Sequence, residues 1–270
     1  MALSLRFCYD SAMKQFKSVA LAAVKTSGKA ILKLQQTSLK YSMKNPRDVL
    51  TEADLKSEKI IVAAIKKNFP DHGILSEEMG TYQTGAAYVW VLDPIDGTIN
   101  YLNKLEEYCI SLALTHKGKV ILGIIYQPAL NKLFIAEQGK GTFLNGKRLR
   151  VSQTGKLINA LAATDSSSQT AVQQRNFAVL YKIGTKVRHV RIFGSIALHM
   201  ARIAEGQLDF HYKARFHFWD CAAGLLLVQE AGGKVTDQHG KTFTAESDCV
   251  VSSNGRLHQK VLKLLKDAGL

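Results

Sequence analysis

The sequence lacks the features of a disulfide-stabilised or membrane-spanning protein. Its 270 residues include only four cysteines, and no two of them are spaced as CxxC or CxxxC. This usage indicates reduced thiols in a cytoplasmic protein. No apolar run approaches the roughly 20 residues that a membrane-spanning helix needs. No apolar segment precedes the first charges of the N-terminus, so we predict no secretory signal peptide.

Prolines are also scarce, which bears on domain organisation. Only four occur, and no Pro- or Ser-rich linker, internal repeat or low-complexity segment divides the chain. We therefore expect a single domain over residues 1–270. Its approximate halves would be 1–150, with N-terminal helices and an antiparallel sheet that carries the acidic motif, and 151–270, an αβ part that closes the site.

Acidic residues are outnumbered by basic ones. The 22 Asp and Glu against 36 Lys and Arg give a formal net charge of +14. Such a charge favours anionic partners, among them nucleic acid, phosphorylated metabolites and membrane surfaces. However, the basic residues are scattered rather than gathered into a block of the kind that makes a nucleic-acid-binding tail. We therefore expect a solvated basic surface, with nucleic-acid binding as the less favoured alternative.

The apolar pattern predicts helices, then an antiparallel meander, then alternating helices and strands, which is a layered α+β or α/β architecture. Amphipathic spacing marks the helices, and the meander shows β-branched runs separated by hairpin signals such as Asn-Gly. The predicted helices cover 11–34, 51–68, 195–204, 220–231 and 257–266. The predicted strands cover 73–78, 87–93, the meander 108–149, 233–237 and 248–254.

One predicted strand ends in two carboxylates, in the segment VWVLDPIDGTINYLN. Asp93 and Asp96 stand three residues apart with Pro94 between them, and Gly97-Thr98 opens a short helical turn. Carboxylates are ligands for a hard cation such as Mg²⁺, and free amides at a helix start attract phosphate. The combination favours metal-assisted phosphate chemistry. The alternative is a plain turn in which Asp96 only caps the following helix.

Three further acidic positions accompany this pair. Glu77 ends a strand-like run, Asp220 precedes a small-residue helix start, and Asp54 follows Thr51 by three residues. Each has a structural alternative: a solvated loop for Glu77, an N-cap for Asp220, and a capping box for Asp54.

These motifs together resemble the inositol monophosphatase family of Mg²⁺-dependent, typically lithium-sensitive phosphatases. Their order and spacing fit the family from about Lys14 to the final helix. The segments that carry the resemblance are DVLTEAD (48–54), GILSEE (73–78), WVLDPIDGTINY (90–101), GKGTFLNGKRLRVS (139–152), FGSIALHMARIAEGQLD (193–209) and WDCAAGLLLVQEAGG (219–233).

The resemblance implies a layered αβαβα sandwich and a site for two to three Mg²⁺ ions. Glu77 and Asp93 would bind the first ion together with the backbone carbonyl of Ile95. Asp93 would bridge to a second ion, which Asp96 and Asp220 would also hold. A weaker third ion would rest on Glu77 and water.

The resemblance also implies catalytic and substrate-binding roles. Thr98 and Asp54 would position the nucleophilic water, with Glu77 as the third catalytic residue. In-line attack without a covalent phosphoenzyme would give an alcohol and inorganic phosphate. The substrate-binding residues would be Asp96, Gly97, Thr98, Gly194, Ser195, Ile196, Lys213 and Asp220. Ser195 is equally suited to cap the helix that follows it.

Lys213 departs from the family pattern, because inositol-preferring members usually carry a glutamate there. A lysine offers only donors and a positive charge. Lys213 is therefore either an exposed loop residue or a pocket residue that favours a second anionic group on the substrate, with Arg215 in support. Such substrates include a sugar bisphosphate or a phosphoadenosine nucleotide.

The sequence therefore predicts a Mg²⁺-dependent phosphomonoesterase, with inositol monophosphate as the default substrate. The alternatives are fructose-1,6-bisphosphatase or phosphoadenosine-phosphate phosphatase activity, and a regulatory RNA- or protein-binding role. From the resemblance we also expect a homodimer that lithium inhibits. The eight histidines show no metal-ligand spacing, so we interpret them as surface or packing residues.

Overall fold

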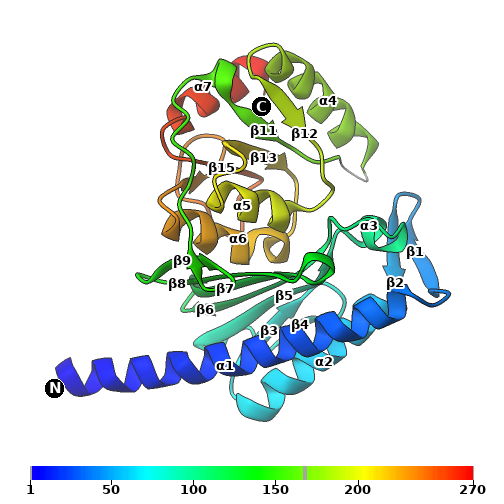
Figure 1. The fold of residues 1–270 in the computed structure, drawn as a ribbon, viewed down its shortest axis with the longest axis vertical. Coiled ribbons are helices and arrows are strands. Elements are labelled where there is room, and N and C mark those ends of the chain that lie inside the picture. The colour runs from blue at the N-terminus through cyan, green and yellow to red at the C-terminus, as the bar shows by residue number, and fades with distance from the viewer. Residues whose placement is uncertain (1, 167–168, 270) are drawn as a thin grey trace.

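A computed structural model describes residues 2–166 and 169–269 and shows five layers (Figure 1). Two N-terminal helices cover one face of an eight-stranded sheet, and two central helices cover its other face. A five-stranded sheet lies on the far side of those helices, and two further helices close the stack (Figure 1). This arrangement confirms the layered αβαβα sandwich.

The first layer consists of α1 (Ala2–Gln35) and α2 (Glu52–Asn68). Both helices were predicted, although α1 begins nine residues earlier than expected, at Ala2. Helix α2 begins where the capping box of the sequence placed it: Thr51 Oγ1 accepts from the amide of Asp54 (3.4 Å), and the Asp54 carboxylate accepts from the amide of Thr51 (2.8 Å). This exchange satisfies amides that a helix start otherwise leaves unpaired.

A β-hairpin that was not predicted lies between these helices, made of β1 (Tyr41–Asn45) and β2 (Asp48–Thr51). We expected only a break in this segment. All five residues of β1 are exposed, so the strand has no apolar alternation from which it could be recognised. The hairpin stands beside the short helix α3 (Thr98–Leu102) at the right of Figure 1.

The eight-stranded sheet contains the predicted meander and is antiparallel except where β3 pairs with β5. Its spatial order is β10-β9-β8-β7-β6-β5-β3-β4. The strands are β3 (Gly73–Ser76), β4 (Gly80–Tyr82), β5 (Tyr88–Asp96), β6 (Cys109–His116), β7 (Lys119–Gln127), β8 (Lys132–Glu137), β9 (Gly141–Leu144) and β10 (Lys147–Arg148), with a 3₁₀ turn at Pro128–Leu130.

The central helices α5 (Ile196–Ala204) and α6 (Phe218–Glu230) pack against the other face of this sheet. Their approach is close at Gly123 of β7, where an added Cβ atom would stand 2.7 Å from the carbonyl oxygen of Ala223. The same apolar core reaches Val250 of the second sheet. Because the core is continuous, we still propose a single domain over 1–270, with its two halves divided near residue 150.

The five-stranded sheet has the order β12-β11-β13-β15-β14, and α4 and α7 cover its outer face. Strands β11, β12 and β13 and helix α4 were not predicted. All five residues of β13 are buried, which removes alternation, and β11 and β12 have only three residues each. The elements are β11 (Leu161–Ala163), α4 (Thr170–Gly184), β12 (His189–Arg191), β13 (Phe210–Ala214), β14 (Lys234–Thr236), β15 (Cys249–Ser253) and α7 (His258–Ala268), with a 3₁₀ turn at Leu157–Asn159.

Within the described ranges 2–166 and 169–269, no helix combines the length and the apolar character needed to cross a membrane.

Candidate functional site

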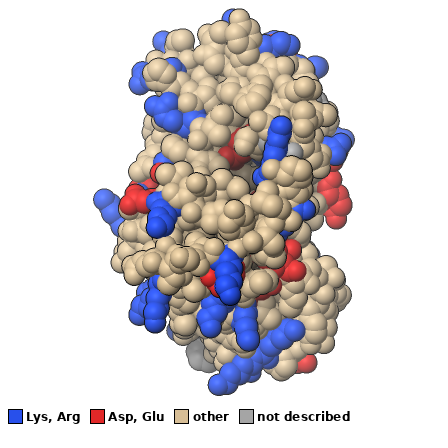
Figure 2. Space-filling model, turned by 90° about the vertical axis from the view of Figure 1, so that its right-hand side faces the viewer, with Lys and Arg blue, Asp and Glu red and all other residues tan. Residues whose placement is uncertain are grey.

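A pocket of about 620 Å³ opens beside the C-terminal end of β5. It gathers residues from distant parts of the chain, and acidic atoms lie recessed among basic side chains on this face (Figure 2). Ten of the residues that the sequence singled out line this pocket: Glu77, Asp93, Ile95, Asp96, Gly97, Thr98, Gly194, Ile196, Lys213 and Asp220.

A bulge in β5 brings Asp93 and Asp96 to the same side of the sheet. Side chains alternate along a strand, so residues three apart normally face opposite sides. Here Asp93 is opposite Ser111 and Asp96 is opposite Cys109, so three steps along β5 match two along β6. One extra residue in a strand shifts the alternation by one position. Pro94 fits this irregularity because proline has no N–H group to donate to a hydrogen bond between strands.

Glu77 reaches the same edge because β3 runs parallel to β5. Ser76 is in register with Leu92, and the amide of Glu77 donates to the Leu92 carbonyl oxygen (3.2 Å). Glu77 therefore lies next to Asp93 across the two strands. Asp220 comes from the first turn of α6, where its Oδ2 accepts from the amide of His217 (2.8 Å).

The crowding of these carboxylates alters their titration. Burial, followed by the nearby charges of Glu77, Asp96 and Asp220, raises the pKa of Asp93 well above its usual value. Burial and Asp96 likewise raise the pKa of Asp220. Burial raises the pKa of Asp96 to about 7, although hydrogen bonds from Ser195 and Ala197 oppose the shift. A divalent cation among these oxygens would remove the repulsion, so this donor set fits a hard metal ion.

Ser195 lies behind Asp96 rather than on the pocket surface. Its hydroxyl donates to Asp96 Oδ2 (2.7 Å), and the amide of Ala197 donates to the same oxygen (2.7 Å). Ser195 Oγ also accepts from the amide of Leu198 (3.2 Å), which confirms its expected role as the N-cap of α5. The two donors hold Oδ2 of Asp96, and neither of them uses its second oxygen, Oδ1.

Thr98 and Asp54 lie within hydrogen-bond distance of each other, with the Thr98 hydroxyl 3.3 Å from Asp54 Oδ1. The same hydroxyl is 3.0 Å from the carbonyl oxygen of Ile95, so its single proton has two acceptors. Asp54 is fully buried below the pocket, where Thr51 holds its Oδ2. Burial raises the pKa of Asp54 to about 6, although the Thr51 hydrogen bonds oppose the shift.

Gly97 has the backbone conformation that the start of α3 requires. Its φ of +96° is in the left-handed region, and an added Cβ would lie 2.7 Å from the carbonyl oxygen of Glu107. A side chain there would therefore be strained and crowded. This position holds the first amides of α3 at the pocket wall.

Lys213 lies on β13 and is only 6% exposed, so it is not the exposed loop residue that was one of our two interpretations. Its ammonium group donates to the carbonyl oxygen of Ser166, and Lys213 lines the pocket. Burial lowers its pKa, although Asp165, Asp220 and Asp96 oppose the shift. Arg47 and Arg215 line the same pocket.

Two groups of residues at the site were missed in the sequence. Lys44, on the unpredicted hairpin, forms ion pairs with Glu77 (2.8 Å) and Glu78 (2.6 Å). Although burial opposes it, these carboxylates raise the pKa of Lys44. The second group is Asp165 with His199 and His211, whose separation in sequence gives no local motif. The histidines are packed as expected, but their shared carboxylate was not foreseen.

This chain is similar to known proteins over most of its length. The model of the inositol monophosphatase family matches residues 12–270. A fructose-1,6-bisphosphatase/inositol-1-monophosphatase of Thermotoga maritima is 40% identical over 82% of this chain and 84% of its own length. A putative Nus factor SuhB of Neisseria meningitidis serogroup B (strain MC58) is 34% identical over 94% of this chain and 98% of its own.

A solved structure of an IMPase/NADP phosphatase, in complex with Mg²⁺ and phosphate, has a TM-score of 0.85 and 27% identity to this chain. The alignment covers 96% of this chain and 97% of that one. The chain belongs to the inositol monophosphatase family.

Proposed function

We propose that this protein is a Mg²⁺-dependent phosphomonoesterase that acts on a small phosphorylated metabolite. The observation that carries the proposal is the meeting of Glu77, the Asp93–Asp96 bulge and Asp220 in one pocket, beside the amides that open α3. Family membership supports a phosphatase of this type, and the Mg²⁺ and phosphate of the related IMPase/NADP phosphatase support the choice of ion.

The metal ligands in this proposal are Glu77, Asp93, the carbonyl of Ile95, Asp96 and Asp220. Bound Mg²⁺ would supply polarisation of the phosphate and a lowered pKa of water. The chain's own residues bind and orient the ion. Ser195 and Ala197 fix one oxygen of Asp96, so that ligand is oriented before an ion arrives.

Thr98 and Asp54 handle the proton of the attacking water in this proposal. The Thr98 hydroxyl accepts from water while it donates to Asp54 Oδ1, in the 3.3 Å contact already described. A carboxylate whose pKa is about 6 is suited to general-base work near neutral pH. The amides of Gly97 and Thr98 would hold phosphate oxygens.

The pocket favours a substrate with a second anionic group over the default, inositol monophosphate. Lys213 is buried in the wall, and Arg47 and Arg215 stand in the same pocket. A sugar bisphosphate such as fructose 1,6-bisphosphate, or a phosphoadenosine nucleotide, would present negative charge to these side chains. Inositol hydroxyls would meet donors only at Lys213.

The substrate experiment is phosphate release with Mg²⁺ over a panel of inositol monophosphate, fructose 1,6-bisphosphate and phosphoadenosine phosphate. The proposal predicts activity that EDTA abolishes, with the doubly anionic substrates preferred. Equal rates on singly and doubly anionic substrates would refute the role of Lys213. Release that persists in EDTA would refute the metal-dependent mechanism itself.

Replacement of Asp93 tests the metal assignment. Asp93→Asn should lower kcat by at least about 10³-fold, because the variant loses the carboxylate shared by two ions. Its fold should be retained, since the change also removes a repelled buried charge. Asp267→Asn, which removes an exposed carboxylate on α7, is the matched control and should keep full activity. Near-normal turnover by Asp93→Asn would sink the assignment.

A regulatory RNA- or protein-binding role remains the second candidate, because a relative is named as a putative Nus factor and the net charge is +14. RNA retention that survives Asp93→Asn and weakens steeply with salt would support it. Binding that is indifferent to ionic strength would count against it. Homodimerisation, inhibition by lithium and a cytoplasmic location also belong to the proposal.

A further inference from the structure

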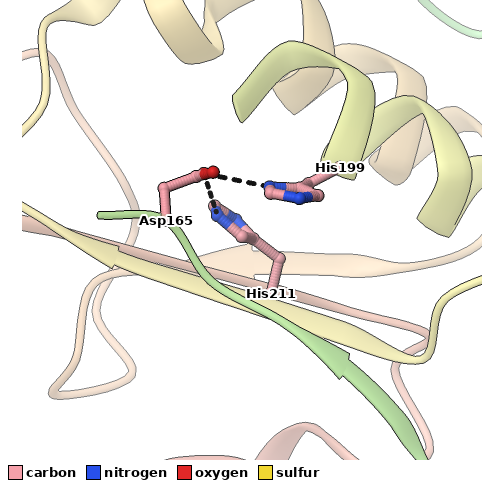
Figure 3. Close-up of side chains that lie close together, drawn as sticks. All are labelled: Asp165, His199 and His211. Carbon is pink, nitrogen blue, oxygen red and sulfur yellow. Dashed lines mark hydrogen bonds and ion pairs between the residues drawn. The ribbon is translucent and has the colours of Figure 1, made fainter. Parts of the chain in front are cut away.

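A buried cluster of one carboxylate and two imidazoles lies against the pocket (Figure 3). Asp165 follows β11, His199 lies on α5, and His211 lies on β13. His199 Nδ1 is 2.9 Å from Asp165 Oδ2, and His211 Nε2 is 3.4 Å from the same oxygen. Both rings are fully buried, and Asp165 also lines the pocket. None of these residues has a place in the mechanism described above.

Two imidazoles and a carboxylate are a common donor set for a transition metal, but the hydrogen bonding of His199 argues against that role. The amide of Phe193 donates to His199 Nε2 (3.2 Å). A neutral imidazole carries one proton, so that proton is on Nδ1 and is donated to Asp165. A metal on Nδ1 would need a ring with no proton, whereas metal-bound histidines usually donate from their other nitrogen.

Hydrogen bonds instead tie Asp165 and His199 to the turn that precedes α5, whereas the buried ring nitrogens of His211 have no hydrogen-bond partner among the residues that the structure describes. Asp165 Oδ1 accepts from the amide of Gly194 (3.1 Å), while its Oδ2 accepts from His199. His199 in turn accepts from the amide of Phe193. Two successive amides of the turn are therefore held from below by the same pair of side chains. Gly194 has a φ of +74°, a left-handed conformation that glycine adopts without strain.

The held turn leads directly to Asp96. Ser195, the N-cap of α5, and Ala197, in its first turn, both donate to Asp96 Oδ2. Movement of the turn would displace these donors, and Asp96, which lines the pocket, would lose the contacts that fix its orientation.

His211 completes the cluster from β13. Its ring lies against that of His199, with centroids 4.9 Å apart. Burial lowers its pKa to about 4, although Asp165 opposes the shift, so the ring is neutral near pH 7. The two carboxylate oxygens of Asp165 accept from the turn and from His199.

We propose that Asp165 and His199 are positioning residues that hold the Phe193–Ser195 turn and, through it, set the orientation of Asp96 as a Mg²⁺ ligand. This inference rests on the proposed function for the identity of Asp96 as a ligand. In this role the two side chains act through the turn and touch neither substrate nor metal.

The test compares Asp165→Asn and His199→Gln with His258→Gln. His258 is an equally buried histidine whose two ring nitrogens lie 2.8 Å from Thr236 Oγ1 and Ser253 Oγ, outside the lining of the pocket. It controls for the loss of a buried hydrogen-bonded imidazole. Calorimetric titration with Mg²⁺ gives the dissociation constant without turnover, and kinetics gives the half-saturating Mg²⁺ concentration, KM and kcat.

Asp165→Asn and His199→Gln should weaken Mg²⁺ binding by about 10- to 100-fold, the usual effect of losing support behind a ligand. At saturating Mg²⁺, kcat should recover most of its wild-type value. His258→Gln should lower the melting temperature but leave Mg²⁺ affinity unchanged. If all three variants lose stability alike and none changes Mg²⁺ affinity, the cluster is structural only and the inference is overturned.

Nitrogen–proton correlation spectra of the imidazoles provide a readout that needs no activity. The inference predicts that the His199 proton is on Nδ1 in the metal-free protein. A proton on Nε2, or Zn²⁺ bound by wild type and by Asp93→Asn but not by His199→Gln, would overturn it. A wild-type protein that shows this tautomer but no Mg²⁺-dependent phosphate release would instead sink the proposed function.

Discussion

At the scale of single residues, the site is defined by carboxylates that are buried from water and lie close to one another. Asp93 and Asp96 are 2% and 8% exposed, and their carboxylates repel each other and Asp220. A protein does not retain such a set for stability, because buried charges without partners are destabilising. This crowding is the physical reason for proposing that cations bind here.

Lys213 gives a substrate prediction at this scale. Lys213→Gln should reduce kcat/KM for a doubly anionic substrate by roughly 10- to 150-fold, the equivalent of a hydrogen bond to a charged group of about 1.5–3 kcal/mol. The rate on inositol monophosphate should change little. Lys186→Gln, which removes an exposed lysine elsewhere, is the matched control. A parallel loss on both kinds of substrate would contradict an anion-binding role.

At the scale of elements, several parts were readable from local patterns. The Thr51–Asp54 capping box and the apolar run of β5 are short-range signals. The capping box lies where it was predicted, and the strand predicted over 87–93 continues to Asp96. The bulge that turns Asp96 to the side of Asp93 was not readable, because it is defined by register against β6. The Asp165–His199–His211 cluster was equally hidden, since its members meet only after β11, α5 and β13 have packed.

Thr51 connects the start of α2 to Asp54 of the proposed catalytic pair, which gives a prediction for this element. Thr51→Ala should destabilise the protein by about 1 kcal/mol, a typical cost of losing an N-cap. It should also lower kcat, since Thr51 Oγ1 donates to Asp54 Oδ2 at 2.6 Å. Thr51→Ser keeps the hydroxyl and should behave as wild type. Denaturant unfolding measures the loss of stability, and phosphate release measures the loss of kcat. A Thr51→Ala variant with normal kcat would show that the N-cap has no role in catalysis.

At the scale of the whole molecule, the five layers explain why the proposed metal ligands come from distant segments. The 8-stranded sheet delivers Glu77 and the Asp93–Asp96 bulge at one edge, and α6 brings Asp220 across from the middle layer. The fold class followed from the order of helices and strands, whereas the β1–β2 hairpin and β13 had no apolar alternation to predict them. For this reason Lys44 was missed, and Lys213 was left between a loop and a pocket interpretation.

The metal-free protein should lose stability as the pH rises, because its folded state holds protons on the site carboxylates that the unfolded chain releases. Asp93 and Asp220 have raised pKa values, and that of Asp96 is about 7. Their contribution to stability is complete below the unfolded pKa of about 4 and is lost as the pH passes the raised folded values.

Mg²⁺ should reverse this trend, since it replaces those protons. At 100 times its dissociation constant it should stabilise the fold by about 2.7 kcal/mol. The gain in melting temperature should therefore be larger at pH 8 than at pH 5 in thermal scans. A Mg²⁺ effect that is the same at both pH values would show that the ion does not bind these carboxylates.

The most direct test of the central claim is anomalous diffraction from a crystal of this protein grown with Mn²⁺ and phosphate. The account predicts at least two anomalous peaks among Glu77, Asp93, Asp96 and Asp220, with phosphate density against the amides of Gly97 and Thr98. A pocket without anomalous density, or a single peak at Asp165, His199 and His211, would contradict it.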